Sequence, residues 1–549
     1  MACIRYDPFA VREDDMPALR DLPPEKAQRK INEIRNGAEM CREYAPFPAF
    51  RPWKDIVFGA WFLVLVVVVL GSAIYYSHYY FGQSAAYAPR LHTPIMSEAD
   101  CQQLCAAGVP ETLPTGCHVV RGECKPKLTL NAWAIAGASI CGASGAVVAA
   151  FFYTLMCHQR PDCVVYTSLF FGPAFCVAVG IGLICAGATR QWGVISGLIF
   201  VVLGVCQFVC VFFCWKSLIP FTIQLTMAVA SVIEEHPSVI FVSLIGGALS
   251  TLWTTAFSVV CMGVYTTDVD PDWDGNNHPD QVDRGGTSSA WGANYVLFLL
   301  CAFVFSWGCQ VAWNICHVTY CGVFGRFYYG ATRHDSVVVP SLHVALTTSY
   351  GSICLGGLLV ATVRAVEAVV KLLMSDARSR DGGSGMNIVV CLVGCVLQCF
   401  VDCLGDILEF FNEWAYVQCA IRGVSFCEAA RITYTLCTCA NMQYILSSLL
   451  LNSLVFLGSM LCAAIGSFSG GLCGYLMSNN GSMELVLPGL VIGFLIGVLA
   501  GSSAITIINS GAKTILVCWA ENQDMLRRTH PELHMAFTER VKDSLEGYI

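Results

Sequence analysis

A long stretch without a charged residue, 285–325, limits what this chain can fold into more than any other feature. Its 41 residues contain no Asp, Glu, Lys or Arg, and most of them are apolar. A helix needs about 20 apolar residues to cross a bilayer. The stretch therefore predicts a transmembrane helix at about 290–318 with its exit on the inner side. The whole chain agrees, because it is 56% hydrophobic and only 13% charged, whereas soluble domains contain about 25% charged residues.

The charge-free stretch carries a polar and aromatic stripe. Two sets of residues recur at helical spacing and so lie on neighbouring faces of one helix: Trp307, Gln310, Asn314 and His317, and beside them Ser306, Trp313 and Tyr320. Unpaired polar groups are costly in lipid. We therefore expect the stripe to face other helices or a cavity rather than lipid.

Further apolar segments predict an all-α fold: a polytopic membrane protein with about ten transmembrane helices plus interfacial amphipathic helices. The predicted spans are 56–80, 131–156, 163–187, 193–214, 238–265, 290–318, 341–366, 387–411, 440–466 and 487–517. The ten Lys and Arg residues in 1–55 favour a cytoplasmic N-terminus. Segments 218–233 and 412–437 are expected to lie at the inner interface. If 218–233 crosses instead, the number of spans is eleven.

These spans divide the chain into five parts. We predict a cytoplasmic N-terminal tail (1–55), a first transmembrane helix (56–80), an extracellular cysteine-containing loop (81–130), a multi-helix transmembrane transport domain (131–517) and a cytoplasmic C-terminal tail (518–549). Residues 1–50 of the N-terminal tail are expected to be mobile.

The predicted outer loops carry candidate modification sites. Four cysteines of the first loop are disulfide candidates in an oxidising space, with four free thiols as the alternative: Cys101, Cys105, Cys117 and Cys124. Asn480 begins an Asn-Gly-Ser glycosylation sequon. The acidic segment 266–286 begins like an EF-hand loop, but Gln281 replaces the Glu that would complete it. We expect it to attract cations without forming a metal site.

The aromatic stripe is a candidate substrate site. Trp253, Trp307, Trp313 and Tyr320 are expected to form an aromatic box for a quaternary ammonium group, held by cation–π attraction. Gln310, Asn314 or Tyr350 would bond a ligand hydroxyl, and His317 is a candidate proton relay. The alternative is that these side chains only pack between helices.

Other clusters favour structural roles. Asp402 and Asp406 share a helix face with Glu409 and Glu413, and we expect them at the interface, although a carboxylate inside the membrane would indicate function. Cys391, Cys395, Cys399 and Cys403 are expected to form a packing seam rather than a metal site. We find no catalytic motif, no cofactor motif and no basic patch for nucleic acid, so the chain is predicted not to be an enzyme.

Four segments of the second half carry recognisable motifs: HVTYCGVFGRFYY at 317–329, SYGSICLGGLLVATVRAV at 349–366, FFNEWAYVQCAIRGVSFCEAA at 410–430 and INSGAKTILVCWAENQDMLRRTHPEL at 508–533. In this order they resemble the choline transporter-like family (solute carrier family 44), particularly its fungal, plant and protist branch. The chain departs from the family at Glu428, where the motif has Ser, and at 522–523, where it has Asp-Pro.

The resemblance implies a fold of about ten spans and a function. The implied function is alternating-access transport of choline or a related cationic amine such as ethanolamine, with proton exchange as one form of coupling. The expected partners are this small amine and the lipid bilayer, in the plasma membrane or an organelle membrane. The alternatives are a membrane scaffold or regulatory protein that does not transport, a channel, and a lipid-handling protein. The oligomeric state is not predicted.

Overall fold

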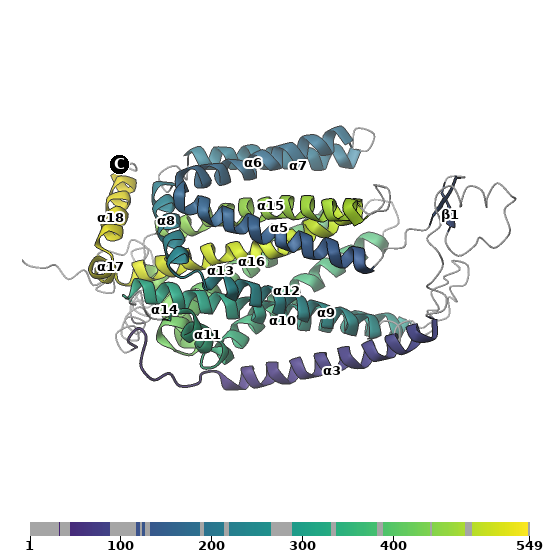
Figure 1. Cartoon of the computed structure of the whole chain (residues 1–549), viewed down its shortest axis with the longest axis horizontal. Helices are drawn as coiled ribbons and strands as arrows, with labels where there is room; N and C mark the ends of the chain where they lie inside the picture. Colours follow the sequence, from purple (N-terminus) through teal and green to yellow (C-terminus); the bar gives the residue numbers. More distant parts are fainter. Residues whose placement is uncertain are drawn as a thin grey trace, which may run out of the picture.

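A computed structural model gives the fold of the chain. It describes residue 32 and residues 44–87, 117–120, 123–126, 132–186, 191–213, 219–264, 288–330, 336–380, 388–439, 442–477 and 486–546. Long helices run side by side, and shorter helices gather at one end of them (Figure 1). We call this the inner end, because the N-terminal segment predicted to be cytoplasmic lies there.

The long elements are α3 (Ile56–Tyr87), α5 (Ala132–Gln159), α6 (Pro161–Ala186), α7 (Gln191–Phe213), α9 (Val239–Val264), α10 (Ser288–Tyr328), α12 (Tyr350–Arg380), α13 (Ile388–Arg422), α15 (Met442–Met477) and α16 (Val486–Glu521). The short ones are α8 (Ile219–Glu235), α11 (Val338–Leu346), α14 (Phe426–Cys439), α17 (Gln523–Thr529) and α18 (Pro531–Glu546). Strands β1 (Cys117–Val120) and β2 (Glu123–Pro126) pair antiparallel, with Val119 opposite Cys124.

The membrane-spanning character of the fold follows from length and composition. Within the described residues, eight helices are apolar and long enough to cross a bilayer: α3, α5, α6, α7, α9, α10, α12 and α15. Helices α13 and α16, with 35 and 36 residues, are also long enough at about 1.5 Å per residue. The predicted all-α polytopic fold is confirmed, and apart from the β1–β2 hairpin the described elements are helical.

Three predicted boundaries are wrong. Helix α10 does not end near 318 but continues to Tyr328, because its last turns are buried by other helices instead of emerging into water. The predicted span 341–366 is two helices, α11 and α12, separated at 347–349. The predicted segment 412–437 is also divided, because Gly423 adopts a φ of +68°, a left-handed conformation that ends helices and favours glycine.

Helix α8 lies across the inner end of the bundle. It runs crosswise to the long helices (Figure 1), as expected for 218–233. Other parts of the chain cover it, so it does not lie exposed on the surface. Leu225, Val229 and Val232 are fully buried. Phe221 of α8 packs on Phe537 of α18, which in turn packs on Trp519. The predicted C-terminal tail therefore begins with two helices that fold back on the bundle.

Helices α5, α15 and α16 pack closely through glycine. A methyl group on Gly493 of α16 would lie 2.3 Å from the backbone oxygen of Gly466 in α15, and one on Gly142 of α5 would lie 2.8 Å from the Cα of Gly493. Small residues allow such close backbone approach in membranes. These three helices therefore form one closely packed unit.

Residues 44–55, which we call the N-terminal strap, are fixed to the inner end rather than mobile. The Phe47 N–H donates to the Ile421 oxygen at 2.8 Å, and the Lys54 N–H donates to the Thr348 oxygen at 3.2 Å. The guanidinium of Arg51 donates to the oxygens of Ala420 (2.6 Å) and Ile421 (2.9 Å). A cation at a helix C-terminus satisfies its last carbonyls and opposes its dipole. The strap thus caps α13.

Candidate functional site

The polar and aromatic stripe of α10 does not line a single site. Its residues divide among three neighbourhoods: an aromatic cluster with α3 and α12, a polar cluster with α13 and α16, and a small cavity with α9 and α16. Helical spacing predicted which residues share a face. It did not predict which neighbouring helix meets each residue.

The aromatic cluster is centred on Phe62 of α3. The Phe62 ring centre lies 5.2 Å from that of Trp307, 6.1 Å from that of Trp253 and 6.5 Å from that of Tyr350. Both indole N–H groups are already engaged, Trp307 with the Cys354 oxygen at 3.0 Å and Trp253 with the Phe305 oxygen at 3.1 Å. Three predicted substrate residues are therefore close together, but a phenylalanine that the sequence did not single out occupies the space between them.

Gln310 belongs to the border of this cluster. Its Cβ would lie 3.5 Å from a methyl group built on Gly357 of α12, so it faces α12 one turn from Trp307. It is partly exposed. Its contact with a ligand stays a prediction.

Asn314 lies in the polar cluster. The Asn314 amide donates to the Tyr416 hydroxyl oxygen at 3.4 Å, and Asn412 donates to the same oxygen at 3.3 Å. Tyr416 donates its own proton to the Ile353 oxygen at 3.1 Å. This network ties α10, α12 and α13 together. Asn314 is 3% exposed, so a ligand reaches it only if this network opens.

His317 connects α10 to α13 and α16. Its Nε2 lies 3.0 Å from the backbone oxygen of Glu413, and its Nδ1 lies 2.8 Å from the Ser510 hydroxyl. A carbonyl only accepts, so Nε2 carries a proton, and in the neutral ring Nδ1 accepts from Ser510. The Glu413 side chain pairs with Lys513 of α16. The predicted relay histidine is thus adjacent to a partly buried ion pair.

A second ion pair joins α13 to α16 nearer the inner end. Arg422 pairs with Glu521, and their side chains are 2% and 6% exposed. Gln418 donates to the Glu521 carboxylate at 3.1 Å and accepts from Arg422 at 2.8 Å. Arg422 also donates to the backbone oxygen of Tyr44 in the strap. Strap, α13 and α16 are therefore held by one guanidinium.

Sequence reasoning missed these four charged residues as a group. Glu413 and Arg422 were assigned to an interfacial helix, and Lys513 and Glu521 lie in the last family-like segment. The available signal was that each charge falls inside a segment matching the family pattern, 410–430 or 508–533. The spacing within either segment does not show that the two segments meet.

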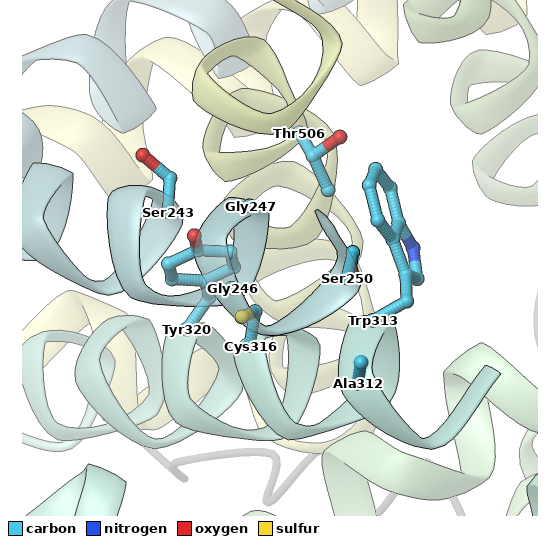
Figure 2. Close-up of a pocket in the computed structure, with 9 residues that line it drawn as sticks. All are labelled: Ser243, Gly246, Gly247, Ser250, Ala312, Trp313, Cys316, Tyr320 and Thr506. Carbon is cyan, nitrogen blue, oxygen red and sulfur yellow. The ribbon is translucent and has the colours of Figure 1, made fainter. Parts of the chain in front are cut away.

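A small cavity lies between α9, α10 and α16 (Figure 2). Its volume for a water-sized sphere is about 10 Å³. The lining consists of Ser243, Gly246, Gly247, Ser250, Ala312, Trp313, Cys316, Tyr320 and Thr506. Trp313 and Tyr320, two of the predicted box residues, therefore face this cavity, while Trp253 and Trp307 lie in the aromatic cluster.

Charges in the N-terminal strap secure α14. Asp55 accepts from the first backbone N–H of α14, at Phe426, with a distance of 2.8 Å. Ser425 and Glu428 bond each other's backbone N–H groups at 3.4 and 2.8 Å, which is a capping box. Burial would raise the pKa of Glu428, but hydrogen bonds from Ser425 and the nearby Lys54 outweigh burial and lower it. Glu428, where the family motif has Ser, thus starts α14.

Positive charge gathers over the ring of Phe47. The guanidiniums of Arg326 and Arg51 lie 4.8 and 5.6 Å from the ring centre. Burial, together with the nearby Arg326, lowers the pKa of Arg51 to about 10. Arg51 nevertheless remains charged at neutral pH. The strap therefore docks by cation–π attraction as well as by hydrogen bonds.

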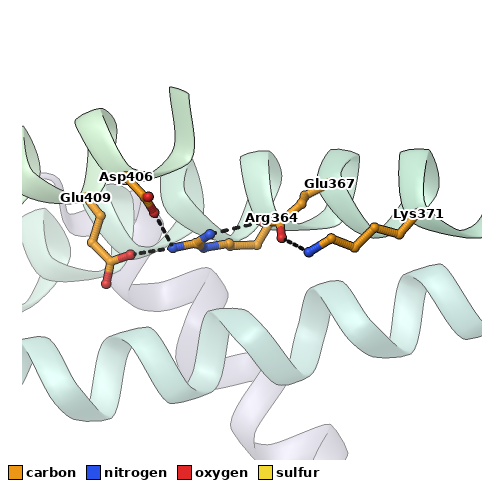
Figure 3. A network of polar contacts seen from close by, with 5 residues as sticks. All are labelled: Arg364, Glu367, Lys371, Asp406 and Glu409. Atoms are coloured by element: carbon orange, nitrogen blue, oxygen red, sulfur yellow. Dashed lines mark hydrogen bonds and ion pairs between the residues drawn. The ribbon is translucent and has the colours of Figure 1, made fainter. Parts of the chain in front are cut away.

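A separate charged network joins α12 and α13 farther from the inner end (Figure 3). Arg364 bonds Asp406 at 3.2 Å, Glu409 at 2.9 Å and Glu367 at 3.0 Å, and Glu367 also pairs with Lys371. Asp406 is 74% exposed. Asp406 and Glu409 are therefore paired with Arg364 of α12 and still largely or partly exposed, and their position at an interface stays a prediction.

Several predictions lie outside what the structure describes. Residues Cys101, Cys105, Asn480 and the acidic segment 266–286 are outside the described ranges. Cys117 and Cys124 are described only as backbone, in neighbouring strands, so their disulfide bonding stays a prediction. The side chain of Asp402 is likewise not described. Among the described residues, no group of three or more His, Cys, Asp or Glu is placed to hold a metal ion.

Comparison with known proteins gives consistent matches. The family model described as plasma-membrane choline transporter matches residues 198–524. A protein named PNS1 from Mycosarcoma maydis is 27% identical over 409 residues, 73% of each chain. A PNS1 protein from Eremothecium gossypii is 26% identical over 385 residues, covering 67% of this chain and 66% of the relative. A CTL-like protein from Dictyostelium discoideum is 25% identical over 358 residues, 63% of this chain and 57% of the relative.

The family match covers the helices that build the three neighbourhoods, with the exception of α3 and its Phe62. Residues 198–524 include α9, α10, α12, α13 and α16 up to the Glu521 carboxylate. The chain spans less than two thirds of the length of two of these three relatives. None of the three names states a substrate.

Proposed function

This chain belongs to the plasma-membrane choline transporter family, and from this premise we propose that it carries choline or a related cationic amine across a membrane. Ethanolamine is a second substrate of the same class. The carrier works by alternating access in the plasma membrane. It is a transporter rather than an enzyme.

One observation supports this proposal above the others: polar contacts between two helix units are concentrated at the inner end. Helix α16, held to α5 and α15 by glycine contacts, meets α10 and α13 through the ion pairs Glu413–Lys513 and Arg422–Glu521 and through the His317–Ser510 hydrogen bond. A carrier closed to the inside requires such bonds at its inner end.

The inner ion pairs are suited to a gate. A buried pair costs desolvation that its attraction only partly returns, so a closed gate held this way opens without a large net penalty when water enters. Rearrangement of α16 against α13 would separate Lys513 from Glu413 and Glu521 from Arg422 together. The strap, which shares Arg422, would then be released.

The proton relay remains part of the proposal. His317 lies between α10, α13 and α16, and its two ring nitrogens bond groups on the other two helices. Taking up a proton changes Nδ1 from an acceptor to a donor, which alters the bond to Ser510. Exchange of protons for the amine through His317, Glu413 and Lys513 would couple the proton to the movement of α16.

The test is uptake of radiolabelled choline by the purified full chain in proteoliposomes, with and without a pH gradient. We expect saturable uptake that competing choline and ethanolamine reduce, and we expect an imposed pH gradient to change its rate. Absence of choline uptake under either condition would contradict the carrier proposal. A scaffold would show no uptake, and a channel would pass measurable current.

A further inference from the structure

A pocket at the inner end lies between the N-terminal strap, the end of α10 and the start of α11. Its volume is about 440 Å³, within the range of about 300–1,000 Å³ that is usual for small-ligand sites. Its lining consists of Phe47, Arg326, Tyr329, Gly330, Ser336, Val337 and Pro340. We call it the strap pocket. It shares no residue with the polar and aromatic stripe of α10, so it is separate from the candidate substrate residues.

Two guanidinium groups make the strap side of this pocket positive. That of Arg326, which lines the pocket, lies 4.8 Å from the centre of the Phe47 ring, and that of Arg51 lies 5.6 Å from the same centre. Burial lowers the pKa of Arg51 to about 10, and the nearby Arg326 contributes to this shift. The Arg51 group is still charged at neutral pH. Two positive charges around one ring create a field that attracts an anion.

Within the described part of the chain, no carboxylate balances the charge of Arg51. Its guanidinium donates there only to the backbone oxygens of Ala420 and Ile421. The acidic side chains near the strap have other partners: Glu521 pairs with Arg422, Glu428 pairs with Lys54, and Asp55 accepts from Ser352 and from the Phe426 N–H. A carbonyl oxygen carries only a partial charge, so an anion that enters the strap pocket would gain the attraction of Arg51 as well as of Arg326.

The start of α11 forms another part of the lining. Ser336 and Val337 precede its first turn, and no side chain caps that turn at Val337. The backbone N–H groups in the first turn of a helix attract anions. This helix end adds to the guanidinium of Arg326, and it would not define a site alone.

From these observations we propose that the strap pocket binds a terminal phosphate group, supplied by the headgroup of an anionic phospholipid in the inner leaflet or by soluble phosphate. Such a group carries about 1.5 to 2 negative charges at pH 7, which matches the two guanidiniums. A planar guanidinium forms paired hydrogen bonds with phosphate oxygens, and basic pockets on the cytoplasmic side of membrane helices are suited to phosphorylated headgroups. The bound phosphate lies between Arg326 and the start of α11. This site is independent of the proposed transport of an amine.

The test measures binding to the purified, detergent-solubilised full chain by microscale thermophoresis with three probes. Short-chain phosphatidic acid carries a terminal phosphate, short-chain phosphatidylserine carries a net negative charge without one, and inorganic phosphate carries the group without a lipid. We expect phosphatidic acid to bind roughly tenfold more tightly than phosphatidylserine. Tighter binding of phosphatidic acid than of inorganic phosphate identifies the lipid as the source, and equal binding identifies soluble phosphate.

Two variants test the pocket itself. Arg326→Gln removes the charge that lines it and is expected to weaken binding of phosphatidic acid roughly tenfold, the loss of charge-assisted hydrogen bonds. Ser336→Glu places a carboxylate in the lining and is expected to weaken binding by a similar factor through repulsion. Ser336 is exposed, so this variant tests the pocket even if Arg326→Gln fails to fold.

Arg527→Gln is the matched control. It also removes an arginine at the inner end, but Arg527 lies on α17, is 66% exposed and does not line the pocket. We expect its affinity for phosphatidic acid to stay within about twofold of the wild-type value, because exposed charges act weakly.

Three results would overturn the inference. Equal affinity of the wild type for phosphatidic acid and phosphatidylserine would mean that net charge alone attracts the lipid. Unchanged affinity for phosphatidic acid in Arg326→Gln or in Ser336→Glu would place the binding elsewhere. A loss in Arg527→Gln as large as that in Arg326→Gln would mean a general effect of positive charge at the inner end. None of these results bears on choline uptake, which is measured separately.

Discussion

At the scale of single residues, the inner end contains charged side chains that are removed from water and paired with opposite charges. Arg422 makes bonds to Gln418, to Glu521 and to the backbone oxygen of Tyr44. Its guanidinium therefore bonds groups on α13, on α16 and in the strap. An arginine suits this position because its planar group carries five donors in a fixed geometry and keeps its charge when buried.

Removing one partner of this pair should be costly. Glu521→Leu leaves the guanidinium of Arg422 buried without a counter-charge, and we expect the free energy of unfolding to fall by about 3–5 kcal/mol. Arg422→Leu/Glu521→Leu removes both charges and should recover much of that loss. Thermal unfolding of the detergent-solubilised chain, followed by tryptophan fluorescence, measures both.

The exposed pair Arg527–Asp524 provides the matched comparison. Its side chains are 66% and 50% exposed, so Asp524→Leu should change the unfolding free energy by less than about 1 kcal/mol. If Glu521→Leu lowered the free energy of unfolding as little as Asp524→Leu does, the Arg422–Glu521 pair would not stabilise the fold as a buried pair. A double variant less stable than Glu521→Leu would likewise contradict the argument.

The residues of the stripe show how far sequence reasoning reaches at this scale. A helical period correctly grouped Trp307 with Asn314 and His317, because periodicity is local. The ring that fills the space beside Trp307, Phe62, comes from α3, more than 200 residues earlier in the chain, and no local pattern connects the two. The structure brings Trp253, Trp307 and Tyr350 together, but their contact with a ligand stays a prediction.

At the scale of elements, glycine decides how closely α5, α15 and α16 pack. A methyl group on Gly493→Ala would meet the Gly466 oxygen at 2.3 Å, so the two backbones must separate. We expect a loss of about 1–3 kcal/mol in the free energy of unfolding. The midpoint of thermal unfolding in detergent measures it.

Gly172→Ala on α6 is the control for this prediction. A methyl group there meets nothing within 4 Å, and alanine favours a helix over glycine by about 1 kcal/mol. This variant should therefore be neutral or slightly more stable than the wild type. If Gly493→Ala were equally stable, α15 and α16 would have room to spare, contrary to the structure.

Most of the long helices could be predicted from the sequence, because membrane-spanning helices have a recognisable apolar composition. The helical spans follow from apolar runs, and the break at 423–425 has local signals in Gly423 and in the Ser425–Glu428 capping box, whereas the interruption at 347–349 has none. Thr347, Thr348 and Ser349 are compatible with a helix, and at their break the Thr348 oxygen accepts from Lys54 of the strap. A break whose bonds come from a distant segment leaves no local signal.

At the scale of the whole molecule, the N-terminal strap links several helices at the inner end. It bonds the last carbonyls of α13 through Arg51, the start of α14 through Asp55, and Arg422 through the Tyr44 oxygen. All three contacts lie at the end where α16 meets α13. A carrier that opens inward must loosen this end, so we expect the strap to hold the inward-closed state.

Buried cysteines report that opening. Cys419 of α13 and Cys157 of α5 are both fully buried, but only Cys419 lies beneath the strap, one residue from the Ala420 oxygen that Arg51 bonds. Arg51→Ala removes two charge-assisted hydrogen bonds, so local opening should increase roughly tenfold or more. N-ethylmaleimide labelling of each cysteine, followed by mass spectrometry, should become faster at Cys419 and stay unchanged at Cys157. An equal rise at both would mean general loosening, and no rise at Cys419 would mean that the strap does not hold the inner end closed.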